Sequence, residues 1–235
     1  MSAAPGSGGM RDRLKRMAAE AAVAEVESGM VLGLGSGSTA EFALAALARR
    51  VVQGLRVTGI PTSERCAALA RRLGIPLTGF AEHRRLDLVI DGADEVEMVG
   101  LDLVKGAGGA LLREKIVASA GRRVVIVVDE GKLVDRLGRR AALPVEIAVF
   151  GAEWLIERLA AIVAGAVNLR QHNGAPFRTD GGNYIVDCAC GEIADPALLD
   201  RRLKALPGVV ETGLFIGLAS RVLVGTPDGV RSLER

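Results

Sequence analysis

The architecture of this chain follows from Val31-Leu32-Gly33-Leu34-Gly35-Ser36-Gly37-Ser38-Thr39, where a short apolar run passes into a glycine-rich turn. The Ala- and Leu-rich segment 40–52 comes next and is typical of a helix. Glycines let the backbone turn tightly and approach a ligand, and the first turn of a helix presents unpaired N–H groups that suit a phosphate. The spacing matches neither the GxxxxGK[ST] loop nor GxGxxG. Taken alone, the turn favours an anion site and a plain strand-to-helix connection equally.

Outward from this turn, apolar runs with strand character alternate with helical segments. We predict strands at 31–34, 55–60, 76–78, 86–90 and 122–128, and helices at 11–28, 40–52, 64–73 and 111–120. This alternation predicts an α/β fold with a doubly wound, mostly parallel, Rossmann-like sheet that has helices on both faces. Ligands of such sheets bind beyond the carboxyl ends of the strands. Because Ser36, Asp91 and Asp129 each come just after a predicted strand, we expect them at the same edge of the sheet.

The pattern changes near Pro144. We predict strands at 143–149, 167–170, 177–179, 184–189 and 208–215, and helices at 154–163 and 196–206. This order is that of a split βαβ unit, so we expect a smaller α+β, ferredoxin-like domain. The run 221–225 reads as a strand that returns to the main sheet. The predicted domains are therefore a catalytic α/β domain at 10–142 plus 214–235, a small domain at 143–213, and a flexible tail at 1–9.

Bulk composition excludes several classes of partner. The formal net charge is +2 and aromatic residues make up 3% of the chain, whereas nucleic-acid surfaces carry a clustered basic excess and stacking aromatics, so no nucleic-acid partner is expected. No apolar run is long enough to span a membrane. The odd number of cysteines, without a CxxC pair, favours a reduced, cytoplasmic setting. The two histidines, His83 and His172, stand far apart, so no metal centre is predicted.

Three further stretches carry groups that move protons or hold oxyanions. They are Asp91-Gly92-Ala93-Asp94, the loop Lys105–Gly109 with Glu114 just beyond it, and Asp129-Glu130-Gly131-Lys132. Close carboxylates raise one another's pKa and so prepare proton transfer. Each stretch also has an ordinary explanation, because Asp91 suits a turn or helix cap and Glu114 sits in a charged Arg-Glu-Lys run typical of a helix surface.

Taken together, these stretches resemble the type A ribose-5-phosphate isomerase family over nearly the whole chain after the tail. The matching segments are Gly33-Leu-Gly-Ser-Gly-Ser-Thr-Ala40, Pro61-Thr-Ser63, Asp91-Gly-Ala-Asp-Glu95, Lys105-Gly-Ala-Gly-Gly-Ala-Leu-Leu-Arg-Glu-Lys115, Leu143-Pro-Val-Glu146, Thr179-Asp-Gly-Gly-Asn183, Gly208-Val-Val-Glu-Thr-Gly-Leu-Phe215 and Gly225-Thr-Pro-Asp-Gly229. The family pattern has Thr more often at Ser36 and Cys66, and Gly at Ala107.

The resemblance implies a role for each matching position. Glu114 is expected as the catalytic base, with Asp91, Asp94 and Lys105 at the reacting end of the sugar. The implied substrate and phosphate contacts are Lys15, Ser36, Gly37, Ser38, Thr39, Gly92, Ala93, Gly106, Ala107, Gly108 and Lys132. The family also implies a homodimer or homotetramer, a sugar phosphate as the small-molecule partner, and no cofactor or metal.

The expected reaction is the interconversion of D-ribose 5-phosphate and D-ribulose 5-phosphate in the non-oxidative branch of the pentose phosphate pathway. A carboxylate can take a proton from C2 and return it to C1, while a cation holds the enediolate oxygens. The alternatives are a sugar-phosphate-sensing module that binds without catalysis, and an acyl- or amino-sugar enzyme on a similar scaffold.

Overall fold

The computed structural model describes residues 7–235, and its largest sheet has the strand order β16-β15-β6-β3-β1-β2. The parallel strands are β1 (Val31–Leu34), β2 (Thr58–Pro61), β3 (Leu88–Asp91), β6 (Val124–Asp129) and β15 (Arg221–Thr226); β16 (Gly229–Glu234) runs antiparallel at the edge. The doubly wound, mostly parallel α/β sheet predicted from the sequence is confirmed. β15 is the run that was expected to return to it.

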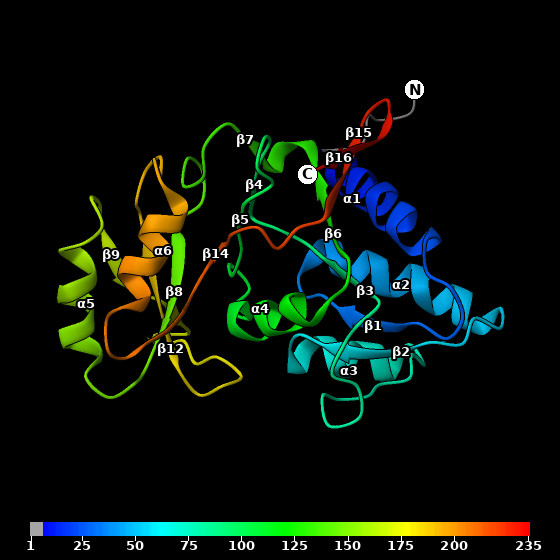
Figure 1. Ribbon diagram of the computed structural model, residues 1–235, viewed down its shortest axis with the longest axis horizontal. Coiled ribbons are helices and arrows are strands. Elements are labelled where there is room, and N and C mark those ends of the chain that lie inside the picture. Colours follow the sequence, from blue (N-terminus) through cyan, green and yellow to red (C-terminus); the bar gives the residue numbers. More distant parts are fainter. Residues whose placement is uncertain (1–6) are drawn as a thin grey trace.

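Helices cover both faces of this sheet (Figure 1). They are α1 (Ser7–Ala24), α2 (Ser38–Val52), α3 (Glu64–Arg72) and α4 (Leu111–Ala120). Successive strand residues point to opposite faces. In β6, Val125 and Val127 join a core cluster with α1, α2 and α3, whereas Val124 and Ile126 join a second cluster with α4. The all-apolar sequence of β6 follows from this burial on both faces.

A second sheet, on the left of Figure 1, is antiparallel with the order β13-β8-β12-β9. Its elements are β8 (Leu143–Ile147), α5 (Ala152–Ala160), β9 (Val167–Leu169), β12 (Tyr184–Cys188), α6 (Pro196–Lys204) and β13 (Val209–Thr212). The order strand–helix–strand–strand–helix–strand is the split βαβ arrangement expected from the sequence. These elements contribute Val145, Leu155 and Leu203 to a third hydrophobic core cluster, which also takes in Val104, Val134 and Leu214 from outside them. We refer to this part of the chain as the small unit.

The structure differs from the sequence prediction inside the small unit. The segment 177–179 was expected to be a strand, but a hairpin of β10 (Gln171–His172) and β11 (Ala175–Pro176) precedes it, and it pairs only through a bridge from Arg178 to Tyr184. Backbone groups at the end of this segment form hydrogen bonds within a turn instead of a sheet. Thr179 N–H donates to the carbonyl of Asn183, and Gly182 N–H donates to that of Thr179.

A third sheet, β14-β5-β4-β7, lies between the other two and was not predicted from the sequence (Figure 1). Its strands are β4 (Glu95–Glu97), β5 (Leu103–Val104), β7 (Leu133–Val134) and β14 (Leu214–Phe215), and the 3-10 turn η1 (Glu130–Lys132) leads into β7. Strands of two or three residues are too short to show a hydrophobic period. This sheet joins the chain segments that enter and leave the small unit.

The ends of several elements also differ from the prediction. α1 begins at Ser7 and so covers part of the expected tail; residues 1–6 lie outside the described residues. The strand expected at 76–78 is reduced to one bridge between Gly59 and Leu77. Within residues 7–235, no helix combines the length and the apolar character needed to cross a membrane.

Candidate active site

A pocket opens beyond the carboxyl ends of β1 and β3 and encloses about 510 Å³ of empty space, its mouth included. Its lining residues are Lys15, Ser36, Gly37, Ser38, Thr39, Gly92, Ala93, Asp94, Lys105, Gly106, Gly108, Glu114 and Lys132. Every one of them belongs to the set that the sequence predicted as site residues. The two remaining predicted residues, Asp91 and Ala107, lie next to the pocket without lining it.

One wall of the pocket is the first turn of α2. Gly37 precedes the helix with a φ of 91°, which favours glycine, and in the described chain no side chain caps this end. The first N–H groups of α2 are therefore available to an anion. Lys15, on α1, donates from Nζ to Ser38 Oγ over 3.1 Å and brings a positive charge to the same wall. Lys132, in η1, supplies a second one.

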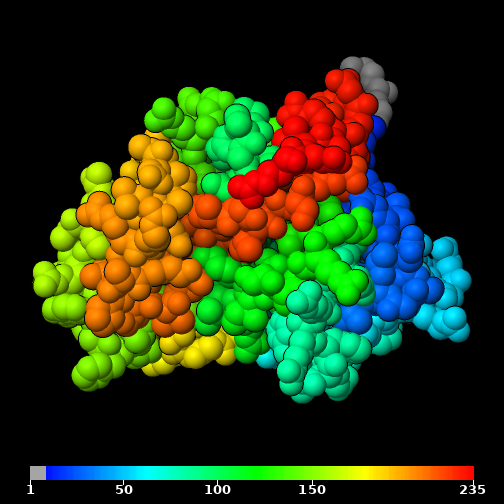
Figure 2. Space-filling view, in the orientation of Figure 1, coloured from blue at the N-terminus to red at the C-terminus, as the bar shows by residue number. Residues whose placement is uncertain are grey.

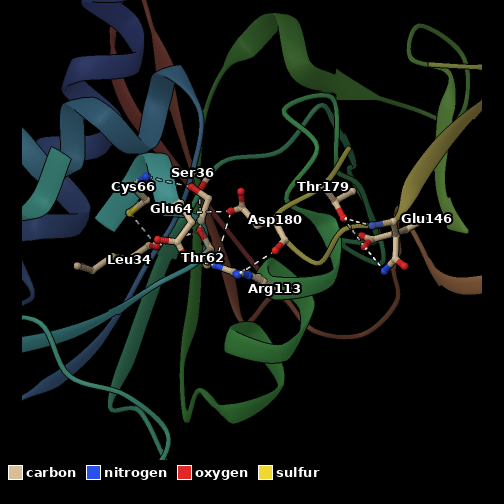
Figure 3. Close-up of polar contacts among 11 residues, drawn as sticks. Leu34, Ser36, Thr62, Glu64, Cys66, Arg113, Glu146, Thr179 and Asp180 are labelled. Carbon is tan, nitrogen blue, oxygen red and sulfur yellow. Dashed lines mark hydrogen bonds and ion pairs between the residues drawn. The ribbon is translucent and has the colours of Figure 1, made fainter. Parts of the chain in front are cut away.

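Ser36 belongs to the pocket wall but its hydroxyl is already engaged. Its Oγ lies 2.7 Å from Thr62 Oγ1 (Figure 3) and 2.7 Å from Ser63 Oγ, and its N–H donates to Asp91 Oδ1 over 3.1 Å. The sequence analysis assigned no site role to Thr62 or Ser63. Their position in the sequence could have indicated one, because both residues directly follow β2 at the edge of the sheet where ligands bind. We therefore assign Ser36 to the shaping of the turn.

Lys105 is the centre of the opposite wall. Its Nζ lies 3.1 Å from Asp91 Oδ2 and 3.4 Å from Glu114 Oε1, and it also donates to the carbonyl of Gly92. The side chains of Lys105, Asp91 and Glu114 are 4%, 3% and 7% exposed. Three charged groups are thus buried together, with one cation between two carboxylates.

The two carboxylates differ in how well they are solvated. Asp91 accepts hydrogen bonds from the N–H groups of Ser36 and Gly92, whereas Glu114 Oε2 is buried without a hydrogen-bond partner among residues 7–235. Burial raises the pKa of Glu114 to about 8, with Asp91 adding to the shift and Lys105 opposing it. Burial raises the pKa of Asp91 as well, but Lys105 and the two N–H groups lower it. The pKa of both carboxyls is raised, but only Glu114 has a buried oxygen without a hydrogen-bond partner among residues 7–235.

The charge on Lys105 is secure. Burial disfavours the ammonium, but Asp91 and Glu114 more than offset this and raise the pKa of Lys105 above its ordinary value.

The backbone of Gly35 lies directly against the Asp91 carboxylate, because a Cβ on Gly35 would lie 2.2 Å from Asp91 Oδ1. Only glycine therefore fits at position 35 beside this carboxylate.

Asp94 connects the pocket floor to the loop that follows Lys105. Its Oδ2 accepts a hydrogen bond from the N–H of Ala107 over 2.9 Å. The sequence raised the question whether alanine is strained at position 107. It is not, because Ala107 has a negative φ, whereas its neighbours Gly106 and Gly109 have φ values of 112° and 81°. The flexible backbone of this loop is supplied by the two glycines.

Asp129 does not line the pocket. It is the last residue of β6, it is buried, and its side chain accepts from the N–H of Gly131 over 3.1 Å. Asp129 thereby shapes the turn that carries Lys132.

Cys66 does not line the pocket either. Its Sγ donates to the carbonyl of Leu34 (Figure 3), and burial raises the pKa of its thiol to about 12.

The chain is similar in sequence to proteins of one enzyme family. Residues 58–229 match the family model described as ribose 5-phosphate isomerase A (phosphoriboisomerase A). The chain is 56% identical over 223 residues to ribose-5-phosphate isomerase A of Gloeobacter violaceus, covering 94% of this chain and 96% of that one. It is 53% identical over 225 residues to the enzyme of the same name from Thermomicrobium roseum, covering 95% and 94%.

Solved structures give the same result. A D-ribose-5-phosphate isomerase in complex with phospho-erythronic acid aligns with a TM-score of 0.92 at 36% identity, covering 96% of this chain and 99% of that one. Ribose 5-phosphate isomerase from Plasmodium falciparum aligns with a TM-score of 0.91 at 41% identity, covering 95% and 99%.

Proposed function

This chain belongs to the ribose 5-phosphate isomerase A family, and from that membership we propose that Glu114 carries the proton between C1 and C2 of the sugar. The chain is an aldose–ketose isomerase that interconverts D-ribose 5-phosphate and D-ribulose 5-phosphate in the pentose phosphate pathway. The observation that carries the assignment of Glu114 is its Oε2, which is buried on the pocket wall without a partner among residues 7–235.

The environment of Glu114 suits a group that both takes and returns a proton. A base is most effective when its pKa lies near the working pH, and burial raises the pKa of Glu114 to about 8. Ionised Glu114 removes the proton from C2 of the aldose, and the resulting acid delivers it to C1 to give the ketose. The same two steps in reverse convert the ketose to the aldose.

Lys105 is placed to stabilise the enediolate that forms between these steps. Its ammonium is fixed by Asp91, Glu114 and the Gly92 carbonyl, so little reorganisation is needed when negative charge develops on the substrate oxygen. Asp94 also lines the pocket, and its carboxylate can relay the proton that moves between the O1 and O2 oxygens. Asp91 contributes indirectly, because its carboxylate holds the ammonium of Lys105 in position.

The phosphate of the substrate fits the wall formed by α2. There the N–H groups of the first turn, the hydroxyls of Ser38 and Thr39, and the charges of Lys15 and Lys132 converge. Holding the phosphate at this wall leaves the other end of a five-carbon chain near Glu114. The fixed orientation then contributes to the rate.

Two finer features belong to the same proposal. Membership of the family supports a homodimer or homotetramer as the working assembly, and the free state of Cys66, Cys188 and Cys190 supports a reduced, cytoplasmic setting. Sedimentation of the purified chain measures the first of these directly.

The decisive experiment is the Glu114→Gln variant with ribose 5-phosphate. We expect kcat to fall by about a thousandfold or more, because an amide cannot accept the proton. Binding of phospho-erythronic acid, measured by calorimetry, should persist because the phosphate wall is intact. The matched control is Glu130→Gln, an exposed carboxylate next to Lys132, which should leave kcat unchanged. A Glu114→Gln enzyme with normal turnover would remove Glu114 from the mechanism.

A further inference from the structure

We propose that Arg170, a residue of the small unit outside the pocket, is a positioning residue for this isomerase, because its guanidinium fixes the orientation of the loop 106–108. The inference rests on the proposed function, in which this loop and Lys105 face the reacting end of the sugar. Arg170 lies between β9 and β10, and its side chain is 15% exposed.

The guanidinium of Arg170 is held on two sides. Its Nε donates to Asp187 Oδ2 over 2.8 Å, and its Nη2 donates to Oδ1 of the same carboxylate. This bidentate contact fixes the plane of the guanidinium. Nη1, on the other edge of the guanidinium, faces the loop 106–108. It donates to the carbonyl of Gly106 over 3.0 Å and to that of Ala107 over 3.1 Å.

These two hydrogen bonds set the direction of the neighbouring N–H groups. In a trans peptide the C=O and N–H point in opposite directions. Because the Gly106 carbonyl points to Arg170, the N–H of Ala107 points away, and it donates to Asp94 Oδ2. By the same geometry the N–H of Gly108 is directed away from Arg170, and Gly108 lines the pocket. Arg170 thus sets which face of the loop the substrate meets.

The loop 106–108 also has contacts that do not involve Arg170, since Gly109 N–H donates to the Gly106 carbonyl and Asp94 accepts from the N–H of Ala107. Gly109 lies against Phe177, where a Cβ would come within 2.5 Å of the ring, and Phe177 lies 5.8 Å below the guanidinium of Arg170. Lys105 N–H donates to the carbonyl of Gly213, which also comes from the later part of the chain. The loop that carries Lys105 is therefore oriented jointly by Asp94 on one hand and by Arg170 and the Gly213 carbonyl on the other.

The test is steady-state kinetics of Arg170→Met and Arg170→Lys with ribose 5-phosphate. We expect Arg170→Met to lower kcat about 10- to 100-fold, since a misplacement of about 1 Å can cost a hundredfold in rate, while KM changes less than about threefold because the phosphate wall is untouched. Arg170→Lys should restore only part of kcat, because one ammonium cannot hold Asp187 and both carbonyls at once.

A matched control separates positioning from general stability. Arg178 also belongs to the small unit, packs 5.1 Å from the ring of Tyr184 and donates to the carbonyl of Gly182, but its side chain is exposed and does not line the pocket. Arg178→Met should leave kcat and KM unchanged. In Arg170→Ala, millimolar guanidinium should raise kcat, whereas equal concentrations of sodium or ammonium should not, because only guanidinium can bridge the carboxylate and the carbonyls.

Three results would overturn the proposal: an unchanged kcat in Arg170→Met, a loss that lies entirely in KM, or a loss equal to the unfolded fraction measured by circular dichroism. If Arg170→Met does not fold, the same criteria apply to Arg170→Lys. A wild-type chain without isomerase activity would instead refute the proposed function. An active wild type with unaffected Arg170 variants would refute only the role of Arg170.

Discussion

The two walls of the pocket differ both in charge and in surroundings. At the wall of α2, Ser38 is exposed and Lys15 and Lys132 are partly exposed, whereas at the other wall Asp91, Lys105 and Glu114 are almost completely buried. The phosphate arrives with its own charge and needs accessible donors. Proton transfer from carbon needs a carboxylate that water does not stabilise, and burial provides it. The difference shows how one pocket separates binding from chemistry.

The strongest way to break this separation is to remove the buried cation. Lys105→Met leaves Asp91 and Glu114 without the charge that compensates them. We expect kcat to fall at least about a thousandfold and the free energy of unfolding to fall by about 3 kcal/mol, because a buried pair that loses one partner is strongly destabilised. Kinetics and urea unfolding measure the two effects.

The control for this variant is Lys204→Met, which removes a lysine that is 38% exposed and paired with Glu211. Its effect on stability should stay below about 1 kcal/mol, because the lysine is more than a third exposed and Lys115 still pairs with the buried Glu211. Turnover by Lys105→Met at the rate of this control would contradict the role given to the buried wall.

The second test uses pH, because burial raises the pKa of Glu114 to about 8. A carboxyl with a raised pKa is neutral below that value, so kcat/KM should rise about tenfold per pH unit up to about pH 8 and then level off. The second ionisation of the sugar phosphate, near about pH 6, should give only a smaller step. A plateau that already begins near about pH 6 would contradict the buried base.

The same pKa shift has a consequence for stability. The folded chain keeps the proton on Glu114 at pH values where the unfolded chain, with an ordinary Glu pKa of 4.5, has lost it. Stability from this group is therefore lost as pH rises from about 4.5 to about 8. Urea midpoints of Glu114→Gln should fall less steeply over this range than those of the wild type.

The smallest expected effect is at the open wall. Lys132→Ala should raise KM for ribose 5-phosphate about tenfold and change kcat less than about threefold, because a partly exposed lysine that meets the phosphate contributes binding energy that substrate and transition state share. The increase in KM should shrink as salt is added, since salt screens exposed charges. A fall in kcat as large as that of Lys105→Met would mean that the two walls are not separable.

The sequence predicted the place of the site, and the reason lies in where the motifs stand. The glycine turn, Asp91 and Asp129 each follow a predicted strand, so a strand prediction was enough to bring them to one edge. Glu114 and Lys132 were implied as site residues by the family resemblance. The fold class came from the alternation of strands and helices, since segments of four or more buried residues show a hydrophobic pattern.

The run Arg113-Glu114-Lys115 shows what the sequence could not reveal. By local pattern it is an ordinary charged surface, yet Arg113 pairs with Glu64 and Asp180 (Figure 3), Glu114 contacts Lys105, and Lys115 is buried against Glu211. These partners are distant in sequence, so no local period records them. Arg170 was missed for the same reason, because the carbonyls of Gly106 and Ala107 that it binds are distant in sequence. The third sheet was missed because its strands are too short to show a hydrophobic period.

The position of β15 in the main sheet affects how the chain can be completed during its synthesis. β15 pairs with β6, but β8 to β14 are all made in between, and α1 packs against both strands. Gly225 lies so close to α1 that a Cβ there would be 2.0 Å from the carbonyl oxygen of Leu14 (in Figure 2 the red and orange C-terminal strands adjoin the blue N-terminal helix). While the ribosome is still adding the small unit, the edge of β6 is uncovered and open to wrong pairing. In the nascent chain, the edge of β6 therefore stays exposed until β15 emerges from the ribosome and pairs with it.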